Sequence, residues 1–183
     1  MIALEPNLSN LSVLPQNPNI SAIEFNSPPL MDTLMENIKK AGQLFPYLQL
    51  EITETATLDN LEKSAALIER LKFQGLKFSV DDFGTGYTSL AMLKDLPIDE
   101  IKIDRSFVND LEKGGKSKAI VDAIIAMTKG FGIDSVAEGI ESQAQLDMLK
   151  AIGCSEGQGY FLAMPMTIEK LQAHVNMGTE QKA

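Results

Sequence analysis

The chain of 183 residues is long enough for one domain that buries roughly 70% of its unfolded surface. Its formal net charge of −9 argues against broad contact with nucleic-acid polymers or anionic membranes. It does not exclude an anionic ligand that metal ions bridge to carboxylates. The only cysteine is Cys154 and the only histidine is His174, so an intrachain disulfide is excluded and a histidine-based site is disfavoured. No membrane segment or secretory signal is visible, and we expect a cytoplasmic protein.

In chain order, residues 1–18 contain three prolines and no clear period, which predicts an irregular N-terminal segment. From 19 to 176, short apolar runs alternate with amphipathic stretches. The predicted strands are 19–23, 48–53, 76–82, 98–104, 134–139 and 157–163. The predicted helices are 30–44, 58–73, 86–95, 117–131, 142–151 and 167–176. A polar tail follows at 177–183. The alternation predicts an α/β fold of right-handed βα units around a parallel sheet.

Charged side chains recur near the carboxyl ends of the predicted strands: Glu51, Asp81, Asp82, Lys102 and Glu138. In a (β/α) barrel this end carries the active site, whereas the opposite end serves stability. Charged groups inside a barrel cost several kcal/mol unless they are paired or bind a metal. Packing alone does not explain five of them at one rim.

The segment VDDFGTGYTSL, residues 80–90, is the most informative of these strand ends. It places Asp81 and Asp82 side by side after an apolar run, before a turn spaced by Gly84 and Gly86. At a strand end both carboxylates can turn toward one pocket, where they call for a proton or a metal ion. The alternative is an ordinary acidic turn, since Asp and Gly are common turn residues.

Five ordered segments together resemble the EAL family of cyclic di-GMP phosphodiesterases. Four of them are LEITET (50–55), VDDFGTGYTSL (80–90), IDEIKIDRSFV (98–108) and VAEGIE (136–141). The fifth, GCSEGQGYF (153–161), is similar to the closing motif of the family. The resemblance implies a TIM-like (β/α) barrel at 19–176. It also implies two divalent cations, Mg²⁺ or Mn²⁺, and the hydrolysis of cyclic di-GMP to linear pGpG.

The resemblance also implies roles for individual residues. Those that match metal ligands of the family are Asn19, Glu51, Asp81, Asp82 and Glu138. Oxygen donors of this kind suit Mg²⁺ and Mn²⁺ better than sulfur or imidazole would.

Other matches concern catalysis and substrate binding. Lys102 matches a lysine that contacts the attacking water or the phosphate, and Gln158 matches a glutamine near that water. Glu138 matches a glutamate that is a metal ligand or the general base, and Glu141 one that holds the DDFGTG loop. Asp82, Lys102 and Gln158 are the expected substrate-binding residues. An alternative stays open for two of these residues. Lys102 can be a buried counter-ion with no role in the chemistry, and the Gln158 side chain can form hydrogen bonds with the backbone alone.

The chain also departs from the family pattern. No Glu-Ala-Leu tripeptide occurs, although the glutamate of that segment is a metal ligand in the family. Only 18 residues precede Asn19, where the family has two strands and their helices. We therefore expect an incomplete barrel with about six of the eight strands. The alternative function is a catalytically impaired or inactive remnant that binds cyclic di-GMP or a protein. Homodimerisation is a further expectation from the resemblance.

Overall fold

The computed structural model describes residues 2–3, 19–20, 27, 31–33, 36, 49–53, 61–85 and 90–164. The predicted helix at 167–176, His174 and the polar tail lie outside the described residues, as does most of the segment 1–18. The division of the chain at residues 18 and 176 therefore stays a prediction. No helix in the described part of the chain is both long enough and apolar enough to cross a membrane.

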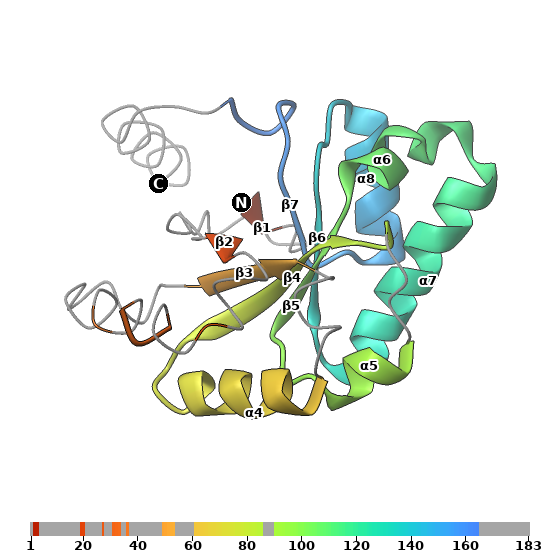
Figure 1. Ribbon diagram of the computed structural model, residues 1–183. Coiled ribbons are helices and arrows are strands. Elements are labelled where there is room, and N and C mark those ends of the chain that lie inside the picture. Colours follow the sequence, from red (N-terminus) through yellow and green to blue (C-terminus); the bar gives the residue numbers. More distant parts are fainter. Residues whose placement is uncertain are drawn as a thin grey trace, which may run out of the picture.

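The strands form one sheet in the order β1-β7-β6-β5-β4-β3-β2. Their bounds are Ile2–Ala3, Asn19–Ile20, Gln49–Thr53, Lys77–Phe83, Glu100–Ile103, Asp134–Ala137 and Glu156–Gly157 for β1 to β7. Strands β2 to β7 pair in parallel, and β1 pairs antiparallel with β7. Because β1 and β2 do not pair with each other among the described residues, the sheet is a partial barrel, as the sequence predicts (Figure 1).

Two strands differ from their predicted extent. Ile2–Ala3 lie in the segment for which no regular structure is predicted, yet they pair with β7 and cover its outer edge. The run 157–163 is predicted as a strand, but pairing ends at Gly157 and the chain then turns. The turn is closed by hydrogen bonds from the N–H groups of Leu162 and Ala163 to the carbonyl of Gly159.

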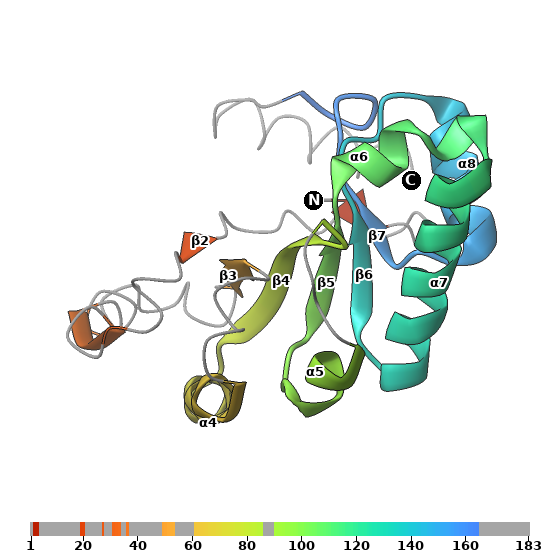
Figure 2. The same cartoon turned by 45° about the vertical axis from the view of Figure 1, so that its right-hand side comes forward.

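The helices that follow the strands cover the outer face of the sheet (Figures 1 and 2). They are α4 (Leu61–Lys72), α5 (Leu90–Asp95), α7 (Gly115–Phe131) and α8 (Gln143–Ile152), each near a predicted helix. Helix α8 begins with a capping box, in which Ser142 accepts from the N–H of Gln145 and the Gln145 side chain reaches back to Ser142. Two short elements were not predicted: α6 (Arg105–Asn109) and the 3₁₀ turn η2 (Leu111–Lys113).

The two faces of the central strands differ in character. The outward side chains are apolar and fully buried against the helices: Leu50, Ile52, Phe78, Val80, Ile101 and Ile103. Each such side chain stabilises the fold by about 1.5–3 kcal/mol. The alternate, inward positions of the same strands are polar: Gln49, Glu51, Ser79, Asp81, Glu100 and Lys102. The register aligns Glu51 with Ser79 and Ser79 with Glu100, so these polar side chains share the concave face.

Candidate active site

Lys102 is the centre of a buried ionic cluster on the concave face. Its ammonium lies 3.0 Å from Glu51 Oε1, 2.9 Å from Asp81 Oδ1 and 2.7 Å from Glu138 Oε1. The Lys102 side chain is only 6% exposed. These residues come from β3, β4 and β5 and from the position directly after β6, which are neighbours in the sheet. The structure thus brings together four of the residues that the sequence singles out.

One cation shared among three carboxylates leaves the cluster with excess negative charge, and the pKa values reflect it. Burial raises the pKa of Glu138, and Asp81 and Glu51 raise it further, against the opposing effect of Lys102. Burial alone would lower the pKa of Lys102. Hydrogen bonds to Glu138 and Asp81 and the charge of Glu51 more than offset this, so its pKa is raised. Lys102 therefore stays charged at neutral pH.

Gln158 completes the cluster from the side of β7. Its Nε2 donates to Glu138 Oε1 over 2.9 Å, so its side chain bonds a site carboxylate and not only the backbone. Its own carbonyl accepts from the N–H of Ile140, whose carbonyl accepts in turn from the N–H of Phe161. An added Cβ at Gly159 would lie 2.2 Å from the Ile140 backbone, so only glycine permits this approach. The segments that carry Glu138 and Gln158 are thereby fixed to one another.

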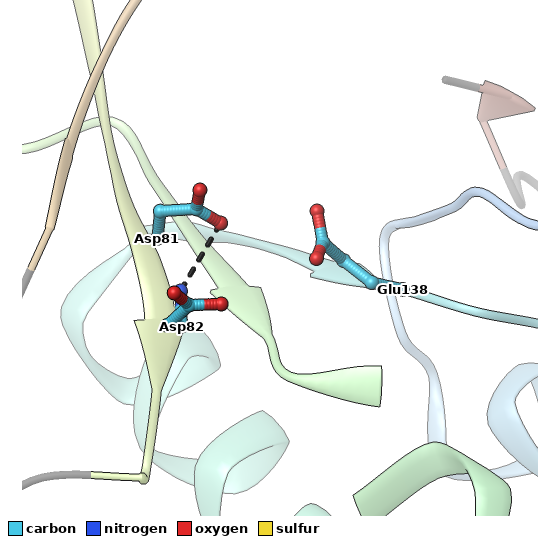
Figure 3. A group of neighbouring side chains, drawn as sticks. All are labelled: Asp81, Asp82 and Glu138. Atoms are coloured by element: carbon cyan, nitrogen blue, oxygen red, sulfur yellow. Dashed lines mark hydrogen bonds between the residues drawn. The ribbon is translucent and has the colours of Figure 1, made fainter. Parts of the chain in front are cut away.

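Asp82 joins the site through an unusual backbone conformation. Consecutive residues on a regular strand point to opposite faces, which would separate Asp82 from Asp81. Asp82 instead has a φ of 54°, and the pairing of β4 with β5 shifts register between Val80 and Phe83. The N–H of Asp82 donates to Asp81 Oδ1 over 3.1 Å. The left-handed residue thus turns both carboxylates to the side on which Glu138 lies (Figure 3).

Among the described residues, the carboxylates of Asp81, Asp82 and Glu138 form a group suited to hold a metal ion. One oxygen from each lies within 4.8 Å of the others. Burial raises the pKa of Asp82, and the charges of Asp81 and Asp104 add to this, while Lys102 and Arg105 oppose it. Three acidic groups that repel one another are stabilised by a divalent cation, and their oxygen donors are those that hard cations prefer.

Two predicted site residues are placed less completely. The backbone of Asn19 in β2 pairs in register with Glu51, which puts Asn19 beside the cluster. Glu141 lies between β6 and α8 with an exposed side chain, and its N–H donates to Gln145 Oε1 over 2.7 Å. None of the described contacts of Glu141 reaches the DDFGTG segment, and Gly86 at its end lies outside the described residues. The roles of Asn19 and Glu141 stay predictions.

A second polar layer, which the sequence analysis did not single out, lies toward the amino ends of the strands. Glu100 is buried, and its Oε1 accepts from Gln49 Nε2 over 2.8 Å. Burial and the charge of Glu156 raise the pKa of Glu100 to about 7, and Asp134 adds to this. The sequence of β5, EIKI, indicates this layer. Residues two apart on a strand face the same side, so Glu100 must lie on the same face as Lys102.

Arg105 and Asp104 at the start of α6 also border the site, as their influence on Asp82 indicates. Both residues stand directly after the predicted strand at 98–104, at the end of the strand where site residues gather. That position is the signal in the sequence for both residues.

Comparison with known proteins finds similar sequences over most of this chain. The family pattern described as EAL domain matches residues 6–165. A relative in Pseudomonas aeruginosa, "Bifunctional diguanylate cyclase/cyclic di-GMP phosphodiesterase MucR", is 40% identical over 157 residues, which is 86% of this chain and 23% of that protein. "Cyclic di-GMP phosphodiesterase NbdA" of the same organism is 38% identical over 154 residues, 84% of this chain and 20% of that protein. The chain thus spans about a quarter or less of these relatives.

Solved structures give the same result. The structure titled "PaMucR Phosphodiesterase, c-di-GMP complex" has a TM-score of 0.78 and 39% identity, over 84% of this chain and 62% of that chain. The EAL domain of Mycobacterium smegmatis DcpA has a TM-score of 0.79 and 34% identity, over 87% of this chain and 72% of that chain. The fold of this chain therefore matches that of these solved structures.

Proposed function

The chain belongs to the EAL domain family, and from this premise we propose that it is a metal-dependent phosphodiesterase that hydrolyses cyclic di-GMP to linear pGpG. The observation that carries the proposal is the Lys102 cluster beside the group Asp81, Asp82 and Glu138. Relatives named as cyclic di-GMP phosphodiesterases and a similar structure titled as a cyclic di-GMP complex support the choice of substrate.

The proposed cofactor is a pair of divalent cations, Mg²⁺ or Mn²⁺. The described residues fit such ions, because their carboxylate oxygens converge while their mutual repulsion is only partly offset by Lys102. Asp81, Asp82, Glu138 and Glu51 would hold the ions, with Asn19 as a further ligand. When bound, the ions supply a nucleophilic water of lowered pKa and a clamp for the phosphate.

The side chains of the cluster have complementary tasks in this proposal. Glu138 is the proposed general base for the attacking water, because its carboxylate lies beside those of Asp81 and Asp82. Lys102 holds Glu51, Asp81 and Glu138 in position, and its charge offsets part of their mutual repulsion. Gln158 fixes the orientation of the Glu138 carboxylate through its amide. Each task rests on contacts that exist before substrate enters.

The test is an incubation of the purified chain with cyclic di-GMP and Mn²⁺ or Mg²⁺, with pGpG measured by chromatography. We expect product from the wild type and from the control Asp95→Ala, whose side chain is exposed at the end of α5, but not from Asp81→Ala. Binding of cyclic di-GMP without hydrolysis would replace the enzyme with the receptor function. A folded chain that neither binds nor cleaves the dinucleotide would refute both.

Two finer proposals accompany this function. A cytoplasmic location is consistent with a single, buried cysteine, Cys154, whose thiol pKa is raised by burial. Homodimerisation is proposed on the family resemblance. A sharp monomer peak that does not change with concentration in size-exclusion chromatography with light scattering would refute it.

A further inference from the structure

Arg105 stands at the rim of the site, on the first turn after β5. It is one of only two arginines in the chain, and it follows Lys102 by three positions. Asp104 directly before it caps α6 by accepting from the N–H of Ser106 over 3.0 Å. The cap fixes the direction in which the chain leaves β5, and with it the position of the Arg105 backbone.

A second contact fixes Arg105 against the segment that carries Glu138. Gly139 follows Glu138 with a φ of 73°, and an added Cβ at Gly139 would lie 2.7 Å from the Cβ of Arg105. The backbones of α6 and of the connection after β6 therefore meet directly. Arg105 thus stands beside the segment that carries Glu138, one member of the acidic group.

The charge of Arg105 is available for a ligand, whereas that of Lys102 is not. Lys102 is almost fully buried and engaged by three carboxylates. Arg105 is exposed, and within the described part of the chain its guanidinium forms no ion pair or hydrogen bond. The backbone of Arg105 is thus fixed, while its guanidinium is unpaired at the rim of an acidic site. Such a guanidinium is suited to bind an anion that enters there. The planar fork of a guanidinium matches a phosphate through two parallel hydrogen bonds.

We propose that Arg105 binds a phosphate of the dinucleotide substrate at the rim of the site. The inference rests on the proposed function, since it names a substrate-binding residue for that reaction. It assigns Arg105 a part in substrate affinity and not in the chemical step. It also supplies a cation at an acidic rim, where a doubly negative ligand would otherwise meet Asp82 and Asp104.

The test compares Arg105→Ala and Arg105→Lys with the control Arg70→Ala. Arg70 is exposed in the last turn of α4, at the opposite end of the sheet from α6 (Figure 1). Hydrogen bonds to charged groups contribute about 1.5–3 kcal/mol, so KM for cyclic di-GMP should rise roughly 10- to 150-fold in Arg105→Ala. We expect kcat to stay within about twofold, since the contact is made equally in the ground and transition states. Arg105→Lys should be intermediate, because it keeps the charge but loses the fork, and Arg70→Ala should match the wild type.

Two competitors separate phosphate binding from base binding. Arg105→Ala should weaken competition by 5′-GMP, which carries a phosphate, and leave competition by guanosine unchanged. An unchanged KM in a variant with wild-type melting temperature would overturn the role of Arg105, as would an equal loss of guanosine competition. If the wild type itself neither binds nor cleaves cyclic di-GMP, the proposed function fails instead, and the two failures are thereby distinguished.

Discussion

Replacing Glu100 with glutamine should stabilise the fold at alkaline pH and leave it unchanged at acidic pH. Glu100 is 5% exposed and its pKa is raised from 4.5 to about 7, first by burial and then by the charge of Glu156. The substitution Glu100→Gln keeps an oxygen to accept from Gln49 and retains nearly the same shape. It removes only the charge, and so isolates the cost of ionising this buried group.

The sign and size of the effect follow from the two pKa values. Below pH 4.5 Glu100 is protonated in the folded and the unfolded chain, and it contributes nothing to the pH dependence. Between 4.5 and about 7 the unfolded chain releases the proton while the folded chain keeps it, so the free energy of unfolding falls as pH rises. At about 1.4 kcal/mol per pH unit, the loss approaches 3 kcal/mol above pH 7.

Urea unfolding at one-unit intervals from pH 4 to pH 9 measures this directly. The difference in unfolding free energy between Glu100→Gln and wild type should be near zero at pH 4 and grow to about 3 kcal/mol by pH 8. Glu69→Gln, an exposed glutamate on α4, is the matched control and should show no such trend. A difference that does not change with pH would refute the reasoning, because it would show that shape and not charge separates the two proteins.

Four further substitutions test other parts of the structure. Lys102→Met should lower the free energy of unfolding by about 3–5 kcal/mol in urea titrations, since it leaves three partly buried carboxylates without their cation. Gly159→Ala should cost about 3 kcal/mol because its methyl would meet the Ile140 backbone, whereas Gly130→Ala in α7 meets nothing and should be stabilising by up to about 1 kcal/mol. Asp82→Gly should stabilise the fold by about 1 kcal/mol, because glycine adopts the left-handed conformation without strain, but should abolish hydrolysis of cyclic di-GMP. Unchanged melting temperatures in any of the four would contradict the corresponding argument.

The order of strands β2 to β7 follows from periodicity, although β1, α6 and η2 do not. Alternating apolar runs and amphipathic stretches predict the strands β2 to β7, and parallel pairing then places their carboxyl ends at one rim. The register of the strands brings Glu51, Asp81 and Lys102 together at this rim. This part of the site is predictable because it requires only the order of the strands and the side to which each residue points.

Local backbone geometry at the strand ends is not predictable in the same way. The left-handed φ of Asp82 depends on the register shift between β4 and β5, which is a property of the pair and not of either segment. Helix α6 has five residues, too few to show a helical period, and only the cap by Asp104 marks its start. Both features place groups at the site, and neither leaves a periodic pattern in the sequence.

The alternation in β3 and β5 shows why burial is harder to predict than orientation. An alternation such as Gln49-Leu50-Glu51 is typical of a strand with one face in water. Here the polar face is buried too, because the sheet curves around it, and Glu51 and Lys102 are 7% and 5% exposed. Curvature is set by the whole sheet and leaves no trace in a single strand.

A buried polar face explains why stability and function are opposed at this site. The ion pair with Lys102 offsets only part of the desolvation of Glu138, whose pKa stays raised. Asp82 adds a further acidic group that its own backbone conformation disfavours. Apolar residues at these positions would give a more stable sheet. Their polarity is accounted for by the proposed site, in which the acidic group holds divalent cations and Arg105 binds a phosphate.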